Sequence, residues 1–164
     1  MSVPVMTLDL RPGDCLLYRT TGTVGWLIRT KTWSPVNHAE AVVSGRLAVA
    51  ARRSGIDIYP IAARGLYAIL RPTDPFDEVA AMEWFMAVAR GQSYHLWGLL
   101  RFFNLGRTNT ETHQQFCSEL LTRWYRKGGF HPFGPCYDAD KTSPGMFLSS
   151  PHFTTVWTRS GSEV

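Results

Sequence analysis

Short apolar runs separated by turn residues fill the first part of the chain, up to about residue 72. Each run spans only a few residues, and in the stretch IDIY the residues alternate in polarity, which is typical of β-strands. Turn residues such as Gly13, Gly45 and Gly55 separate the runs. The runs lie at 15–18, 38–43, 47–51, 56–59 and 66–70. This spacing predicts an antiparallel meander of roughly four to six strands.

A helical period follows the predicted strands. Asp74 and Pro75 supply an N-cap and a first-turn proline, and Gly91 is a suitable end. Between them, apolar residues recur at spacings of three and four, at Val79, Met82, Met86 and Ala89. We therefore expect a structural helix that packs this apolar stripe against the core.

A second helical pattern covers Gln114 to Tyr125 and has a cysteine near its beginning. Leu120, Leu121 and Trp124 form its apolar stripe, and the polar face carries Glu119, Thr122, Arg123 and Arg126. Cys117 lies where the helix begins, and the positive end of the helix dipole favours a thiolate over a thiol there. Cys117 is thus a candidate nucleophile, although a lone buried cysteine is more often a packing residue.

The remaining residues complete an α+β pattern. Gly128 and Gly129 end the Cys117 helix, a short helix is expected within 142–151, and a last strand is expected at 153–158. A chain of 164 residues with 45% hydrophobic residues can form one core, so we expect a single domain over residues 1–164.

Charge and cysteine content narrow the classes of protein only slightly. The formal net charge of +4 comes from scattered Arg and Lys, so we expect a solvated surface and no nucleic-acid partner. Three cysteines, an odd number without a CxxC pair, indicate reduced thiols. The first residues lack a secretory signal pattern, and no run approaches about 18 apolar residues. We expect no transmembrane segment and a cytoplasmic location, or delivery by a phage, while the oligomeric state stays open.

A histidine and a glutamate on one predicted strand are the candidates for activating the thiol. His38 opens the strand of the stretch NHAEAVVSG, and Glu40 lies two residues later, so both side chains project from the same face. A carboxylate beside an imidazole orients it and keeps it basic, as a Cys–His nucleophile pair requires. His113, four residues before Cys117, is a rival base without a nearby carboxylate.

An oxyanion donor and a metal ion are two further possible components of the same site. Tyr94 could donate a hydrogen bond to a developing oxyanion if it reached Cys117, whereas the neighbouring His95 caps or faces solvent. Metal binding by His38, His113 and Cys117 lacks a recognised zinc spacing, so we expect neither a metal nor a cofactor.

The order of these motifs resembles the circularly permuted NlpC/P60 proteins, a papain-like group in which the histidine precedes the cysteine. The resemblance lies in LRPGD, NHAEAVVSG, a strand ending LRP, a helix leading to GQSY, and FCSELL, over about residues 8–157. It implies an antiparallel sheet or half-barrel that bears the histidine and packs against the helix that bears the cysteine. It also implies Cys117 as nucleophile and His38 as general base, with Tyr94 near the thiol.

The sequence departs from this group at two places. The strand after the histidine strand reads LAVAA, where relatives commonly supply a third polar residue, so Glu40 is the best substitute. His95 stands where relatives commonly have Asp after the Tyr.

The resemblance implies a cysteine hydrolase acting on a peptide or acyl substrate. The first expectation is a thiol peptidase or amidase that cleaves peptidoglycan through an acyl-enzyme, as in bacterial and phage relatives. A lipid-directed acyltransferase or thioesterase with the same Cys–His site is the enzymatic alternative. An inactive papain-like binding module, in a phage assembly for example, is the alternative from another class.

Overall fold

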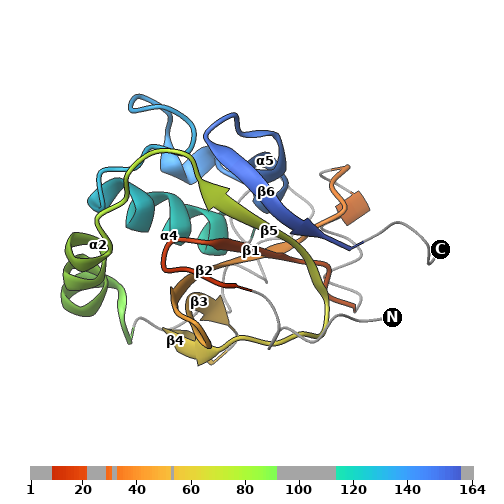
Figure 1. The fold of residues 1–164 in the computed structure, drawn as a ribbon, viewed down its shortest axis with the longest axis horizontal. Helices are drawn as coiled ribbons and strands as arrows, with labels where there is room; N and C mark the ends of the chain where they lie inside the picture. Colours follow the sequence, from red (N-terminus) through yellow and green to blue (C-terminus); the bar gives the residue numbers. More distant parts are fainter. Residues whose placement is uncertain (1–8, 22–28, 31–32, 53, 92–113, 160–164) are drawn as a thin grey trace, which may run out of the picture.

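The described residues form a six-stranded antiparallel β-sheet with a few helices, an α+β arrangement (Figure 1). The computed structural model describes residues 9–21, 29–30, 33–52, 54–91 and 114–159. Its strands are β1 (Cys15–Tyr18), β2 (His38–Ser44), β3 (Leu47–Arg52), β4 (Gly55–Pro60), β5 (Leu66–Pro72) and β6 (Phe153–Thr158). All six coincide with runs in which the sequence predicts a strand, so these predictions are confirmed.

The strand order, β4-β3-β2-β1-β5-β6, departs from a simple meander. The first four strands pair with their neighbours along the chain, as predicted. The chain then returns from β4 to the other side of β1, where β5 pairs with β1 and β6 pairs with β5. β1 and the middle strands are thereby placed at the centre of the sheet, which fits their nearly complete burial.

Helices cover one face of the sheet (Figure 1). They are α2 (Glu78–Trp84), which continues as the π-helix η2 (Phe85–Ala89), then α4 (Gln114–Lys127), the short 3₁₀-helix η3 (Ala139–Lys141) and α5 (Pro144–Ser149). The Cys117 helix, the short helix within 142–151 and the last strand are all where the sequence predicts them.

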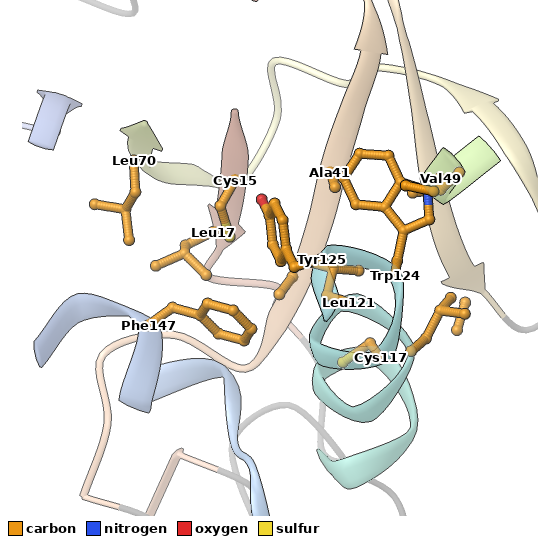
Figure 2. Packing of buried hydrophobic residues seen from close by; sticks show 14 of the residues in the cluster. Cys15, Leu17, Ala41, Val49, Leu70, Cys117, Leu121, Trp124, Tyr125 and Phe147 are labelled. Atoms are coloured by element: carbon orange, nitrogen blue, oxygen red, sulfur yellow. The ribbon is translucent and has the colours of Figure 1, made fainter. Parts of the chain in front are cut away.

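Large apolar side chains of α4 and α5 fill the space between the helices and the sheet. Figure 2 shows Trp124 of α4 against Ala41 and Val49 of the sheet, Tyr125 beside Trp124, and Phe147 of α5 beyond Tyr125. Residues that alternate with Ala41 and Val49 project to the opposite face, which carries a smaller apolar cluster of Leu16, Tyr18, Val42, Ala48, Leu66 and Ile69. Burial of such large aromatic surfaces holds α4, and the cysteine in it, firmly against β2 and β3.

The α2 region differs from its predicted packing. The N-cap is Asp77, whose carboxylate accepts a hydrogen bond from the Ala80 N–H at 3.0 Å, and Asp74 lies outside the helix. Val79 and Met86 of the predicted stripe are 62% and 50% exposed. The buried residues of the segment are instead Ala81, Phe85 and Ala89, spaced by four. The π-helical turn has a longer period than an α-helix, and this keeps Phe85 and Ala89 on one buried face.

The polar face predicted for α4 is also wrong at one residue. Thr122 is completely buried, and its hydroxyl donates to the Ser118 carbonyl one turn earlier at 2.8 Å. A threonine can bury its hydroxyl inside a helix in this way because the carbonyl four residues before it accepts the hydrogen bond.

Replacement of Gly128 by alanine is expected to destabilise the fold by roughly 1–3 kcal/mol, the usual cost of overpacking. Gly128 lies at the end of α4 against the start of α2, where the Asp77 N–H donates to its carbonyl at 2.9 Å. A Cβ atom there would come 2.6 Å from the Asp77 carbonyl oxygen, which is backbone and cannot rotate away. Urea unfolding of Gly128→Ala measures the effect. Gly45→Ala is the control, since a Cβ on Gly45 would meet nothing within 4 Å. Equal stability of the two variants would contradict the expectation.

Candidate active site

Cys117 lies in the first turn of α4, buried in the layer between helix and sheet (Figure 2). Backbone N–H groups of Ala39, on β2, and of Ser118, on the helix itself, donate hydrogen bonds to its sulfur. The aromatic packing that presses α4 onto the sheet is therefore what brings the thiol to the beginning of β2. The sulfur is in a position where several donors favour the thiolate.

His38 is the first residue of β2, and its ring contacts both Cys117 and Glu40. The Nε2 atom lies 3.0 Å from Glu40 Oε1, and the ring also hydrogen-bonds to the Cys117 thiol. Since Nε2 is used by Glu40, Nδ1 is the ring atom left for the sulfur. The His38 side chain is 20% exposed, so the imidazole remains open to solvent on one side.

The electrostatics of the two groups favour a thiolate paired with an imidazolium. Burial alone would raise the pKa of Cys117, but the hydrogen bond to His38 and the positive charge of that ring outweigh it, so the thiol pKa lies below its ordinary value. Burial would lower the pKa of His38, but the hydrogen bonds to Cys117 and Glu40 raise it to about 10. Both shifts act in the same sense, since each favours a proton on the ring and a negative charge on the sulfur.

Cys15 shows what burial does without such a partner. It lies fully buried on β1, and burial raises the pKa of its thiol far above the ordinary range. It belongs to the hydrophobic core on the helix side of the sheet. The two buried thiols thus shift in opposite directions, and the imidazole beside Cys117 accounts for the difference.

Glu40 is only 2% exposed, and its carboxylate contacts the side chains of both His38 and Arg52. It accepts from His38 and, through both carboxylate oxygens, from the guanidinium of Arg52 on β3 at 2.9 and 3.0 Å. Burial would raise the pKa of this carboxyl, but its hydrogen bonds to His38 and Arg52 lower it below its ordinary value. The carboxylate is therefore charged, and it holds the imidazolium on the side away from Cys117.

The strand alternation explains how these groups meet. Ala39 and Ala41 of β2 belong to the helix-side core, so Glu40 between them projects to the opposite face. Arg52 does the same on β3, next to Ala51. His38 stands at the very start of its strand and contacts Glu40 on that face and Cys117 on the helix side. The structure thus brings together Cys117, His38 and Glu40, hereafter the candidate triad.

Arg52 was missed in the sequence, although a usable signal was present. Ala41 pairs with Val49 across the β2–β3 hairpin, and continuing that register places Arg52 opposite His38. The stretch LAVAA contains no polar residue, and the arginine follows it directly. The signal in the sequence is the arginine at the end of this strand. A β-bulge between Val42 and Ser44 shifts the register by one residue, so a count outward from the turn does not by itself place Arg52 opposite His38.

Tyr18 forms part of the surroundings of the imidazole. Its ring centroid lies 6.0 Å from that of His38, on the neighbouring strand β1. The phenol is buried, and burial together with the Glu40 charge raises its pKa well above the ordinary value. Its hydroxyl lies near Glu40 but has no partner of good hydrogen-bond geometry among the described residues. Tyr18 therefore shields the triad as a neutral group.

A hollow of about 260 Å³ lies beside α4, the helix that carries Cys117. Its walls combine apolar residues such as Ile56, Val88 and Leu120 with the charged residues Glu119 and Arg123. Leu120 follows Cys117 by three residues, and residues with this spacing lie on the same side of a helix. The hollow therefore lies on the Cys117 side of α4, about one helical turn from the thiol.

Several residues named in the sequence lie outside the described part of the chain. These are Tyr94, the candidate oxyanion donor, together with His95 and the rival base His113. Within the described ranges, no group of three or more His, Cys, Asp or Glu residues could hold a metal ion. In the same part of the molecule, no helix has both the length and the apolar character needed to cross a membrane.

No known family model matches the chain, and no curated protein shows significant similarity to it.

Proposed function

We propose that this chain is a cysteine hydrolase that cleaves an amide bond through an acyl-enzyme on Cys117. The observation that carries the proposal is the hydrogen-bonded contact of a buried thiol with a histidine that a buried carboxylate holds from the other side. Nucleophilic cysteines are activated by this arrangement, because the imidazole takes the thiol proton and the carboxylate stabilises the resulting imidazolium. Structural cysteines such as Cys15 have no need of it.

The reaction follows from the position of each group. The Cys117 thiolate attacks the carbonyl carbon, and backbone N–H groups near the helix start stabilise the tetrahedral oxyanion. Tyr94 is the proposed further donor on the strength of the resemblance alone. The His38 imidazolium gives its proton to the leaving amine, which releases the amine and leaves a thioester on Cys117. His38, now neutral, takes a proton from water, whose oxygen attacks the thioester. The acid product leaves, and the thiolate–imidazolium pair is restored.

The proposed fold is the permuted papain-like arrangement of the NlpC/P60 group. It is supported by the order of the elements, with a histidine strand that precedes the cysteine helix, and by the packing of that helix on an antiparallel sheet. The order of the five sequence motifs supports it independently.

The proposed substrate is the amide bond of a cell-wall peptide, which the resemblance ranks first. A lipid-directed acyltransferase or thioesterase would share the thioester intermediate and differ in whether water, an amine or an alcohol takes the acyl group. An inactive module that binds a partner would form no thioester.

Incubation with defined substrates tests the proposal and separates these alternatives. We expect the protein to release new amino and carboxyl groups from muropeptides, detected by mass spectrometry, and to leave phospholipid vesicles and an acyl thioester unchanged. Each reaction is repeated with Cys117→Ala as the blank. Product from phospholipid or thioester alone would replace the amidase with the acyl-directed alternative. No product from any of the three would favour the binding module.

A further inference from the structure

The guanidinium of Arg52 is bound to Glu40 in a two-pronged arrangement. Its Nε donates to Oε1 at 2.9 Å, the oxygen that His38 also contacts, and its Nη2 donates to Oε2 at 3.0 Å. Two parallel hydrogen bonds between planar groups fix both the position and the rotation of the carboxylate. Glu40 therefore has one orientation available, and in it Oε1 faces the imidazole.

Arg52 is itself held in place by the next strand. Its guanidinium carbon lies 4.6 Å from the centre of the Tyr59 ring, and Nη2 also donates to the Pro60 carbonyl at 3.2 Å. A chain of contacts thus crosses the sheet: residues of β4 hold Arg52 on β3, Arg52 holds Glu40 on β2, and Glu40 holds His38. The orientation of the imidazole depends on three adjacent strands and not on β2 alone.

A buried carboxylate needs a cationic partner such as Arg52 to stay charged and so to orient a histidine. Charged groups removed from water are destabilised, and an unpaired buried carboxyl tends to take up a proton. A neutral carboxyl neither attracts an imidazolium nor selects one ring orientation. Arg52 supplies the compensating charge at a site where solvent reaches Glu40 very little.

We propose that Arg52 is a positioning residue of the candidate triad, which keeps Glu40 charged and oriented toward His38. This inference rests on the proposed function, since it assigns a role in activating Cys117. It also identifies the polar contribution from the strand after the histidine strand, at the arginine that ends LAVAAR. Arg52 does not touch the thiol, so it acts only through Glu40.

A purely structural ion pair between β2 and β3 is the competing explanation, and the pH profile of Cys117 distinguishes the two. The rate of Cys117 alkylation by iodoacetamide is followed by peptide mass spectrometry from pH 4 to 10 and normalised to its high-pH plateau. The midpoint of this profile reports thiolate formation and is insensitive to modest changes in stability. The variants are Glu40→Gln, Arg52→Met, Arg52→Lys and the double variant Glu40→Gln/Arg52→Met.

We expect Glu40→Gln to shift the midpoint of the profile upward by about one pH unit, so on the rising part of the profile, below the midpoint, the alkylation rate falls by about tenfold. Arg52→Met should lower the rate there in the same direction, by at least about threefold. Arg52→Lys keeps the charge and should recover part of that loss. The double variant should match Glu40→Gln alone within about twofold, because Arg52 has no other route to the thiol.

Arg90→Met is the matched control. Arg90 also pairs with a carboxylate of the sheet, Asp57 at 2.9 Å, but that pair is exposed and lies away from the candidate triad. Its profile should coincide with that of the unsubstituted protein. Thermal unfolding identifies any variant that fails to fold. If Arg52→Met does not fold, the profile of Arg52→Lys is compared with that of the unsubstituted protein instead.

Three results would overturn the role of Arg52 while leaving the proposed function intact. In the first, Arg52→Met keeps the original profile while Glu40→Gln shifts the profile. In the second, Arg52→Met speeds alkylation at pH 6. In the third, the effect of the double variant equals the product of the two single effects. An unsubstituted Cys117 that titrates as an ordinary thiol would instead overturn the proposed function, and this role of Arg52 with it.

Discussion

Replacement of Cys117 by serine is expected to lower kcat/KM by at least about 10⁴-fold while the fold is retained. A hydroxyl has a far higher pKa than a thiol, so the imidazole at this site cannot ionise it as it ionises the sulfur. The residual rate would come from binding and backbone donors alone, and losses of this size are usual when a nucleophile is removed. The measurement is hydrolysis of the muropeptide identified as substrate, with circular dichroism to verify the fold.

Cys136→Ser is the control for this experiment. Cys136 is a free, exposed cysteine outside the helix–sheet layer, so the same chemical change there should leave kcat/KM within about twofold. If Cys117→Ser retained more than about a tenth of the activity, Cys117 would not be the nucleophile, whatever its contacts.

Replacement of His38 by glutamine is expected to have the second large effect on kcat/KM. Glutamine occupies a similar volume but cannot hold the proton, so kcat/KM should fall by about 10³-fold or more. The pKa of Cys117 should also rise, because burial remains while the imidazolium is lost. An ordinary thiol with a pKa of about 8.5 is only about 0.3% thiolate at pH 6, so alkylation of Cys117 at that pH should fall by about two orders of magnitude.

His152→Gln is the matched control for His38→Gln. His152 also lies near a carboxylate, with Nδ1 3.5 Å from Asp74, but it contacts no member of the candidate triad. Its replacement should change neither turnover nor the reactivity of Cys117. An unchanged alkylation rate at pH 6 in His38→Gln would show that another group maintains the thiolate, and His113 would be the first residue to test.

The sequence predicts the strands better than the helix packing, for a physical reason. Strands such as β2 and β3 are bounded by turn residues, and the alternation of their side chains follows directly from the backbone. This is why the closeness of His38 and Glu40 could be foreseen. The stripe through Val79 and Met86 was wrong because the segment also has an apolar face through Ala81, Phe85 and Ala89, and it is this face that packs against the core.

Two features of the sheet lay beyond such local patterns. The position of β5 beside β1 depends on a long-range choice between alternative neighbours, which short apolar runs do not specify. The contact between Cys117 and His38 depends in addition on how Trp124 and Tyr125 seat α4 on the sheet. The sequence therefore indicates only that Cys117 and His38 are candidates for a contact. Whether they lie within contact distance depends on the packing of these large side chains.

The most direct test of the central claim is the pH profile of Cys117 alkylation in the unsubstituted protein. Iodoacetamide modification is measured by mass spectrometry in the folded protein and, as reference, at the same cysteine in the urea-unfolded chain. The imidazolium at His38 should keep Cys117 a thiolate in the folded protein well below the pH at which the unfolded chain begins to react. Folded and unfolded profiles that coincide, or a Cys117 that never reacts in the folded protein, would contradict the account.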